Sequence, residues 1–216
     1  MSITRQNLTI VIVTFKSEEV IYECIKSIDN RIKIIVVENS HNPEFKNKIE
    51  KLYNNVECVI STENLGMGKG NNLGINLTKT DYVLILNPDV ILEKKTIDEL
   101  FKASNMISDF AILAPISDNK SYPNYKLDDT HEIYKEKNFL FEVKSVDGFA
   151  MLINKKRIDE NMNIKNQSYF DKNFFMYLEN DDLCKRLKDK NEKIFIVPSA
   201  KINHLGAKAV NSKFKN

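Results

Sequence analysis

The sequence lacks the features that mark membrane-spanning, secreted and zinc-binding proteins. No apolar run approaches the roughly 18 residues of a membrane-spanning helix. The polar residues 1–7 lead directly into an apolar run of strand type, so we expect no secretory signal. The three cysteines, Cys24, Cys58 and Cys184, include no C-x-x-C pair. Widely spaced cysteines in apolar contexts favour reduced, packed thiols of a cytosolic protein over disulfides or a zinc site.

A large net charge of either sign is also absent. The formal charge of +2 argues against extensive contact with nucleic acid. The final sixteen residues nevertheless contain four lysines and no acid, at Lys201, Lys208, Lys213 and Lys215. These lysines either belong to a solvated tail or contact an anionic membrane surface, and the sequence leaves both interpretations open.

Short apolar runs alternate with amphipathic segments through the first half of the chain. Four runs are rich in strand-forming residues and too short for helices, which indicates buried strands. They lie at residues 8–13, 33–37, 56–60 and 82–86. Helical spacing of apolar residues follows Ser17 and Asn42, and a short helix is expected over about 70–77. This alternation predicts an α/β fold whose mainly parallel sheet is flanked by helices on both faces.

A polar residue follows each of these strands. They are Thr14, Glu38, Asn64 and Asp89. Pro88 lacks an N–H group and restricts the backbone of Asn87, so the fourth strand must end there and leave Asp89 just beyond it. Because the carboxyl ends of parallel strands meet at one edge of a sheet, where α/β proteins bind ligands, we expect a binding site at this edge.

The second half of the chain is less regular. The predicted elements are a helix at 96–107, a strand at 110–114, a strand at 149–153, a helix at 182–190 and a strand at 194–197 that ends before Pro198. The polar, turn-rich stretch 115–138 is too long for an ordinary connection. We therefore predict one domain over residues 1–216, with a repetitive half at 1–114 and an irregular half at 115–216.

Two features of the first half have both a structural and a functional interpretation. Residues 66–74 contain four glycines but match neither G-x-G-x-x-G nor a P-loop. They either approach a ligand closely or form a tight turn. Asp89 either hydrogen-bonds within its own turn or binds Mg²⁺ or Mn²⁺, which prefer carboxylate oxygens as ligands.

The second half offers an acidic cluster and a histidine. Asn180 is expected to be the N-cap of a helix with acids in its first turn, a structural role for the cluster. A carboxylate such as Glu179 in these apolar surroundings could instead accept a proton from a hydroxyl. His204 is either structural or the donor of a nitrogen to Mn²⁺, whereas His41 and His131 are expected in solvated loops.

Taken together, these pieces resemble the inverting nucleotide-sugar glycosyltransferases of family two, which have the GT-A fold. The resemblance covers nearly the whole chain from residue 8 to residue 206, in seven segments that occur in the family's order. They are Thr14, 37–40, 64–74, 87–89, 146–149, 175–186 and 204–206. The chain is similar in these segments to bacterial rhamnosyl- and glycosyltransferases of surface polysaccharide synthesis.

The resemblance implies a metal-dependent enzyme and assigns its ligand contacts. Asp89 would bind Mn²⁺ or Mg²⁺ in a D-x-D-type motif, here reduced to residues 87–89, and His204 would contact the metal or the diphosphate. The implied contacts to the nucleotide sugar are Thr14, Phe15, Glu38, Asn64, Gly70, Asn71, Asn87 and Gly148. Residues 1–114 would then bind the nucleotide, and residues 115–216 would bind the acceptor.

The catalytic acid motif departs from the family's pattern. Many members have Glu-Asp-x-Asp, and the second residue is the proposed base in several of them. Here that residue is Asn180, which cannot take a proton. The role of base would then fall to Glu179 or Asp182, and we favour Glu179.

The resemblance also implies the partners. The donor would be a nucleoside-diphosphate sugar and the acceptor a glycan or lipid-linked sugar, in the cytoplasm at the inner face of the membrane. Two other functions are left open. Asn180 favours a non-catalytic nucleotide-sugar binder, whereas a sugar nucleotidyltransferase would need an N-terminal glycine-rich, basic loop that this sequence lacks.

Overall fold

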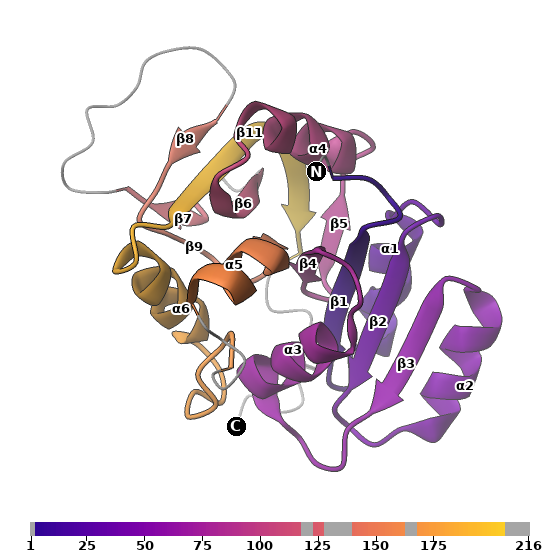
Figure 1. The fold of residues 1–216 in the computed structure, drawn as a ribbon. Coiled ribbons are helices and arrows are strands. Elements are labelled where there is room, and N and C mark those ends of the chain that lie inside the picture. The colour runs from indigo at the N-terminus through magenta and orange to yellow at the C-terminus, as the bar shows by residue number, and fades with distance from the viewer. Residues whose placement is uncertain (1–2, 118–122, 128–139, 163–167, 206–216) are drawn as a thin grey trace.

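Strands and helices alternate through the first half of the chain, as the sequence predicts (Figure 1). The computed structural model describes residues 3–117, 123–127, 140–162 and 168–205. The first elements are β1 (Leu8–Thr14), α1 (Glu18–Lys26), β2 (Lys33–Glu38), α2 (Pro43–Leu52), β3 (Val56–Ile60), α3 (Gly66–Leu77) and β4 (Tyr82–Leu86). All four predicted strands are confirmed. Asn42 caps α2, because its side-chain oxygen accepts a hydrogen bond from the Phe45 N–H at 3.0 Å.

The described residues after β4 form strands of 2 to 12 residues and three more helices. These elements are β5 (Val90–Leu92), α4 (Thr96–Met106), β6 (Phe110–Ser117), β7 (Tyr125–Lys126), β8 (Phe141–Glu142), β9 (Ser145–Val146), β10 (Ala150–Asn154), α5 (Lys155–Met162), α6 (Glu179–Lys188) and β11 (Lys193–His204). The predictions that became α4, β6 and β10 are confirmed. The sequence analysis did not predict β5 or α5.

Nine strands form one mixed sheet in the order β3-β2-β1-β4-β10-β6-β11-β5, with β8 also paired to β11. The pairs among β1, β2, β3 and β4 are parallel. Strand β10 enters antiparallel between β4 and β6, and β11 runs parallel to β6 but antiparallel to β5. Strands β7 and β9 form a separate antiparallel pair. A mainly parallel sheet flanked by helices confirms the predicted fold class.

Helices cover both faces of this sheet, and the alternation of side chains along β1 explains how. Ile10 and Ile12 pack with apolar residues of α1, α2 and α4 in one core cluster. Val11 and Val13 point to the opposite face and pack with residues of α3, α5 and α6 in a second cluster. Every residue of β1 is therefore buried, which explains why apolar residues are consecutive over 10–13 instead of alternating with polar ones.

Three predicted boundaries were wrong: the end of β11, the start of α6 and the start of α3. Strand β11 does not stop at Pro198 but continues to His204, with a register irregularity between Val197 and Lys201 that accommodates the proline. Helix α6 begins at Glu179 instead of 182, so Asn180 lies inside its first turn and is not the N-cap. Helix α3 begins at Gly66 instead of Gly70.

The cysteines lie in the core, and most of the basic tail lies outside the described residues. All three cysteines are free and buried, as expected, and burial raises the pKa of Cys58 and Cys184 to about 12. Of the four tail lysines, only Lys201 falls within the described residues, where it is exposed on β11. Lys208, Lys213, Lys215 and His131 lie outside them. Within the described part of the chain, every helix is too short or too polar to cross a bilayer.

Candidate active site

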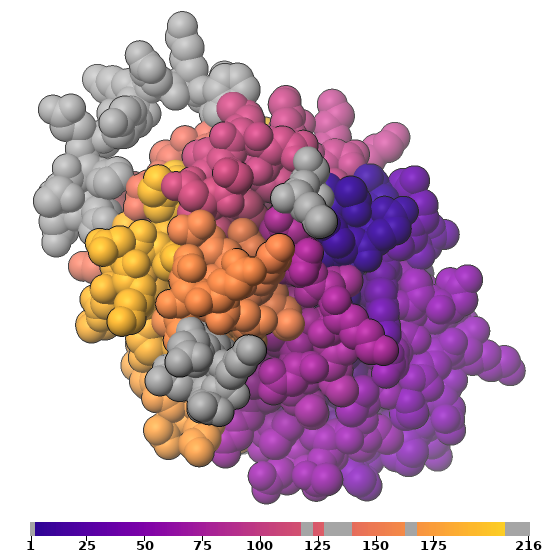
Figure 2. Space-filling model, viewed as in Figure 1, coloured from indigo at the N-terminus to yellow at the C-terminus, as the bar shows by residue number. Residues whose placement is uncertain are grey.

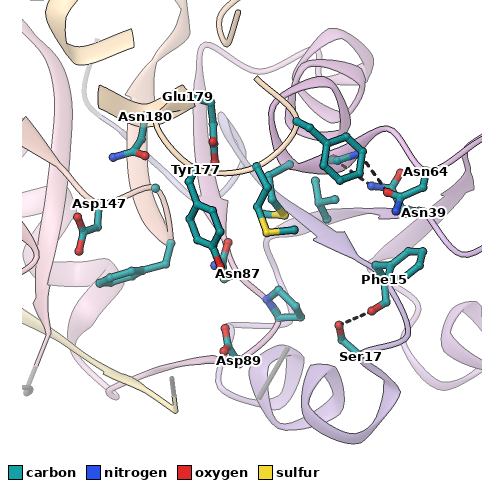
Figure 3. Close-up of a pocket in the computed structure, with 18 of the residues that line it drawn as sticks. Phe15, Ser17, Asn39, Asn64, Asn87, Asp89, Asp147, Tyr177, Glu179 and Asn180 are labelled. Carbon is teal, nitrogen blue, oxygen red and sulfur yellow. Dashed lines mark hydrogen bonds between the residues drawn. The ribbon is translucent and has the colours of Figure 1, made fainter. Parts of the chain in front are cut away.

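A pocket of about 720 Å³ lies where the two halves of the chain meet (Figure 3). Its walls come from the ends of β1, β2 and β4, the start of α3, the turn before β10, the start of α6 and the end of β11. The predicted site residues that line it are Phe15, Asn64, Asn87, Asp89, Gly148, Glu179 and His204. The expected convergence at one sheet edge therefore extends to residues more than 100 positions apart.

Buried polar atoms without hydrogen-bond partners concentrate at this pocket. Among the described residues there are five such side-chain atoms, in Asn39, Asn71, Asn87, Asp89 and Glu179. All of these residues except Asn71 line the pocket. Because leaving a buried polar atom unpaired costs about 1–3 kcal/mol, this concentration indicates a site built for a polar ligand.

Asp89 and His204 form the acidic and imidazole pair of the pocket. Asp89 is only 2% exposed, and its Oδ1 lies 3.4 Å from His204 Nε2 without hydrogen-bond geometry. The pairing of β11 with β5 brings them together, since His204 lies opposite Val90 and the Leu205 N–H donates to the Asp89 carbonyl at 3.0 Å. The ring of Phe149 packs 4.2 Å from that of His204 and orients it.

This pair has the ligand types that Mg²⁺ or Mn²⁺ accepts. The buried Oδ1 of Asp89 has no hydrogen-bond partner and lies 3.4 Å from His204 Nε2, so a carboxylate oxygen and an imidazole nitrogen lie close enough to serve one ion. The described residues hold no cluster of three His, Cys, Asp or Glu side chains suited to a metal. An ion here would therefore take its other ligands from water and from substrate phosphates, which is common for Mg²⁺.

Glu179 and Asp147 are the two acids of the pocket whose pKa values are raised by burial, and Glu179 has the less exposed side chain. It is 8% exposed and its Oε2 has no partner. Burial raises the pKa of Glu179 above its ordinary value, and the charge of Asp181 adds to the rise. A carboxyl with a raised pKa that faces a pocket is suited to accept a proton from a bound hydroxyl.

Asp182, the other candidate base, does not line the pocket. Its carboxylate accepts a hydrogen bond from Arg186 Nε at 2.8 Å, one turn along α6. The same guanidinium also donates to the carbonyl of Tyr169. Asp182 therefore helps to hold α6 to the preceding loop, and Glu179 is the one of the two acids that faces the pocket.

Asn180 joins α6 to the turn before β10. Its Nδ2 donates to the Val146 carbonyl at 2.9 Å. Gly148 permits this contact, because a Cβ at that position would lie 3.2 Å from Asn180 Cβ. Asn180 thus positions the turn carrying Asp147 and Gly148, both of which line the pocket.

Glu38 and Thr14 lie behind the pocket wall. They are opposite each other in the β1–β2 pairing and both are buried. The Glu38 carboxylate accepts hydrogen bonds from the Ser40 N–H at 2.8 Å, from the Ser40 hydroxyl and from the Asn42 N–H at 2.7 Å. With these donors its oxygens organise the turn after β2, and neighbouring Asn39 lines the pocket instead.

The glycines of α3 serve close packing more than ligand contact. A Cβ on Gly70 would lie 2.8 Å from Val13 Cγ1, and one on Gly74 would lie 2.3 Å from Val11 Cγ1. Only Gly66, with a left-handed φ of 69°, forms the tight turn that opens the helix and also lines the pocket. Gly70 and Asn71 are buried within α3, outside the pocket lining.

Several pocket residues were missed by the sequence analysis. They are Lys16, Asn39, Met67, Asp147, Phe175, Met176 and Tyr177. Three of them lie next to a segment that the sequence did single out: Asn39 directly follows a predicted strand, Lys16 follows Phe15, and Asp147 begins the break before Gly148. The remaining four lie within the segments 64–74 and 175–186, which were assigned by their resemblance but not as far as these side chains.

Comparisons with known proteins agree with this geometry. The family model described as "Glycosyl transferase family 2" matches residues 9–175. The low-salt glycan biosynthesis hexosyltransferase Agl10 of Haloferax volcanii is 27% identical over 201 residues, which cover 86% of this chain. This chain spans 62% of that relative's length.

Solved structures share the fold at low sequence identity. GalNAc-T7, solved with UDP, GalNAc and Mn²⁺, has a TM-score of 0.72 at 12% identity over 92% of this chain and 43% of its own. S. aureus TarS 1-349 in complex with UDP has a TM-score of 0.67 at 15% identity over 91% and 60%. The chain has the GT-A fold of these structures, and because the family model matches most of its length, it belongs to glycosyl transferase family 2.

Proposed function

We propose that this chain transfers a sugar from a nucleoside-diphosphate sugar to an acceptor hydroxyl with inversion. The observation that carries the proposal is the meeting of Glu179 with the Asp89–His204 pair in one pocket, where oxygens of both acids are buried without partners. The hexosyltransferase name of the Haloferax relative and the UDP in the two structural neighbours support it.

The donor would bind to the wall formed by residues 1–114. Phe15, Asn39, Asn64 and Asn87 line this wall and offer an aromatic ring and three amides to a nucleotide sugar. The backbone of this wall would be held in place by predicted contacts that do not line the pocket, namely Thr14, Glu38, Gly70 and Asn71. Residues 115–216 would supply the acceptor side, including Gly148.

Asp89 and His204 would hold Mn²⁺ or Mg²⁺. A bound ion would neutralise negative charge on the leaving diphosphate. The Mn²⁺ in the GalNAc-T7 structure supports a divalent ion at a site of this fold.

Glu179 would act as the general base. Its unpaired Oε2 would accept the proton of the acceptor hydroxyl as that oxygen attacks the anomeric carbon from the face opposite the diphosphate. Positioned base catalysis typically contributes about 10²–10⁴-fold to the rate. The enclosing walls would add to this by aligning donor and acceptor.

The acceptor would be a glycan or a lipid-linked sugar in the synthesis of a cell-surface polysaccharide. The words "glycan biosynthesis" in the name of the Haloferax relative support this setting. The protein would then work in the cytoplasm, at the inner face of the membrane.

A thermal-shift panel of nucleoside diphosphates and their sugars, with and without Mn²⁺, tests donor and metal binding together. At 100 times its Kd, a ligand of the folded state stabilises it by about 2.7 kcal/mol, which raises the Tm of a domain of this size by about 5–11 °C. One nucleotide should produce this rise with Mn²⁺ present. Asp89→Asn should abolish the metal-dependent part, whereas Asp189→Asn, on the exposed end of α6, should not.

A second candidate function is nucleotide-sugar binding without catalysis. It is favoured by Asn180, which occupies the position of the family's usual base. Release of nucleoside diphosphate, measured with the donor found in the panel, distinguishes the two. Release that increases with acceptor supports transfer, and binding without any such release supports the second function.

A further inference from the structure

Four consecutive apolar side chains are exposed beside the pocket. Phe175, Met176, Tyr177 and Leu178 are 53%, 41%, 75% and 59% exposed, and the first three line the pocket. We name residues 175–178 the apolar lip. In Figure 2, the light-orange atoms of the segment before α6 lie at the lower left of the molecule, next to purple atoms of the first half.

Backbone hydrogen bonds hold the apolar lip in place. The Phe175 carbonyl accepts from the Met67 N–H at 2.9 Å, and the Leu178 carbonyl accepts from the Asp182 N–H at 2.9 Å. Further back, the Asn72 amide makes two hydrogen bonds to the backbone of Phe170, at 2.7 and 2.9 Å. The lip therefore presents its side chains from a fixed backbone.

The conformation of the lip is locally unfavourable. Tyr177 and Leu178 have φ values of 68° and 70°, a left-handed region that bulky residues rarely adopt. Gly66 helps to make room, since a Cβ there would lie 2.1 Å from the Phe175 carbonyl oxygen. A strained backbone that keeps apolar side chains in solvent indicates a functional surface.

The size and chemistry of the lip fit a bilayer surface best. A stable protein interface needs roughly 800 Å² from each partner, more than four adjacent side chains offer. The Tyr177 hydroxyl is the only strong hydrogen-bonding group among these four side chains, so the lip is mainly apolar. By contrast, a few apolar side chains suffice for insertion at a membrane interface, where tyrosine is enriched. Exposed Phe15 and Lys16 line the same pocket and add an apolar and a cationic group.

We propose that the apolar lip inserts into the surface of a lipid bilayer and so brings the pocket to a lipid-linked acceptor. The acceptor part rests on the proposed function, whereas insertion itself does not. Residues 175–178 thereby gain a role separate from the basic tail, because the lip can insert without Lys208, Lys213 or Lys215.

A tryptophan reporter tests insertion directly, because the chain contains no tryptophan. The full chain carrying Phe175→Trp is mixed with phosphatidylcholine vesicles containing phosphatidylglycerol. Its emission should shift to shorter wavelength and be quenched by lipids brominated on their acyl chains. Leu52→Trp, at an equally exposed site on α2, should show neither effect. No shift for Phe175→Trp, or equal shifts at both sites, would overturn the proposal.

Vesicle flotation with matched double variants provides the second measurement. Phe175→Ser with Leu178→Asn removes two lip side chains, and asparagine tolerates the left-handed backbone. Bound protein should fall at least about tenfold, given the hydrophobic contribution of each buried methylene. Leu52→Asn with Met106→Ser removes two equally exposed side chains elsewhere and should leave binding unchanged.

Vesicle binding tests insertion of the apolar lip, whereas sugar transfer tests the proposed function. Vesicle binding through the lip without sugar transfer would contradict the function alone. Insertion alone would be contradicted if the protein transferred sugar to a water-soluble acceptor but did not bind vesicles. The same would follow if both double variants lost vesicle binding equally.

Discussion

Glu179 and Asp89 are held in the pocket at an energetic cost. Each has a buried oxygen with no hydrogen-bond partner. An apolar or amide side chain at either position would avoid the cost of desolvating a charge. Replacing either acid should therefore lower activity without lowering the stability of the fold.

Glu179→Gln should lower turnover by about 10²–10⁴-fold while donor affinity stays unchanged, because the amide keeps the size but cannot take a proton. The measurement is turnover at saturating donor, with donor affinity from the thermal-shift titration. Asp182→Asn, which alters only an ion pair with Arg186, is the control and should retain most of the turnover. The reverse ranking of the two variants would assign the base to Asp182.

The raised pKa of Glu179 also predicts a pH dependence of stability. Burial disfavours the ionised form in the folded state, so the folded pKa lies above the unfolded value of about 4.3. Stability should then fall as pH rises from the unfolded pKa to the folded pKa. Glu179→Gln removes this loss, so its Tm should exceed that of the native protein at pH 7 and match it below about pH 4. Equal Tm values at pH 7 would show that ionised Glu179 is not destabilising.

At the scale of elements, α3 shows why a glycine-rich segment was hard to interpret. Four glycines in residues 66–74 suggested a ligand loop or a tight turn, and the tight turn is confirmed at Gly66. Gly70 and Gly74 instead allow α3 to pack closely on β1. Local sequence contains no signal for which strand a helix will cover, so this use of glycine could not be predicted.

Gly74→Ala should destabilise the fold by about 1–3 kcal/mol, the usual cost of overpacking. The added methyl would lie 2.3 Å from Val11 Cγ1, which outweighs the gain in helix propensity of about 1 kcal/mol. Urea denaturation measures the change, and Asn76→Ala at an exposed site of α3 is the control that should not destabilise. Combining Gly74→Ala with Val11→Ala should recover part of the loss, and a purely additive result would exclude the clash.

At the scale of the whole molecule, the two halves share one sheet. Strand β10 from the second half pairs with β4 on one side and with β6 on the other. The pocket lies across the same junction, with residues 13–89 on one wall and residues 147–204 on the other. A donor bound there would contact both halves.

The shared sheet predicts that both halves unfold together. Far-UV circular dichroism, which follows the whole backbone, and the emission of Phe141→Trp, at a ring that packs on Tyr125 within the second half, should give the same urea midpoint. Both midpoints should rise together when the nucleotide found by thermal shift is added with Mn²⁺. Two separate midpoints would show that residues 1–114 fold independently of the rest.

The sequence by itself determined the chemistry of the chain and its local structure. Largely apolar runs specified β1, β2 and β4, because strands covered on both faces bury nearly every residue, and the segments 64–74, 87–89 and 175–186 indicated the family. Only the tertiary structure decided that β10 lies between β4 and β6, and that β11 passes Pro198 to bring His204 to Asp89. Periodicity is a short-range signal, whereas these contacts join residues 39 or more positions apart through strand pairing and side-chain packing.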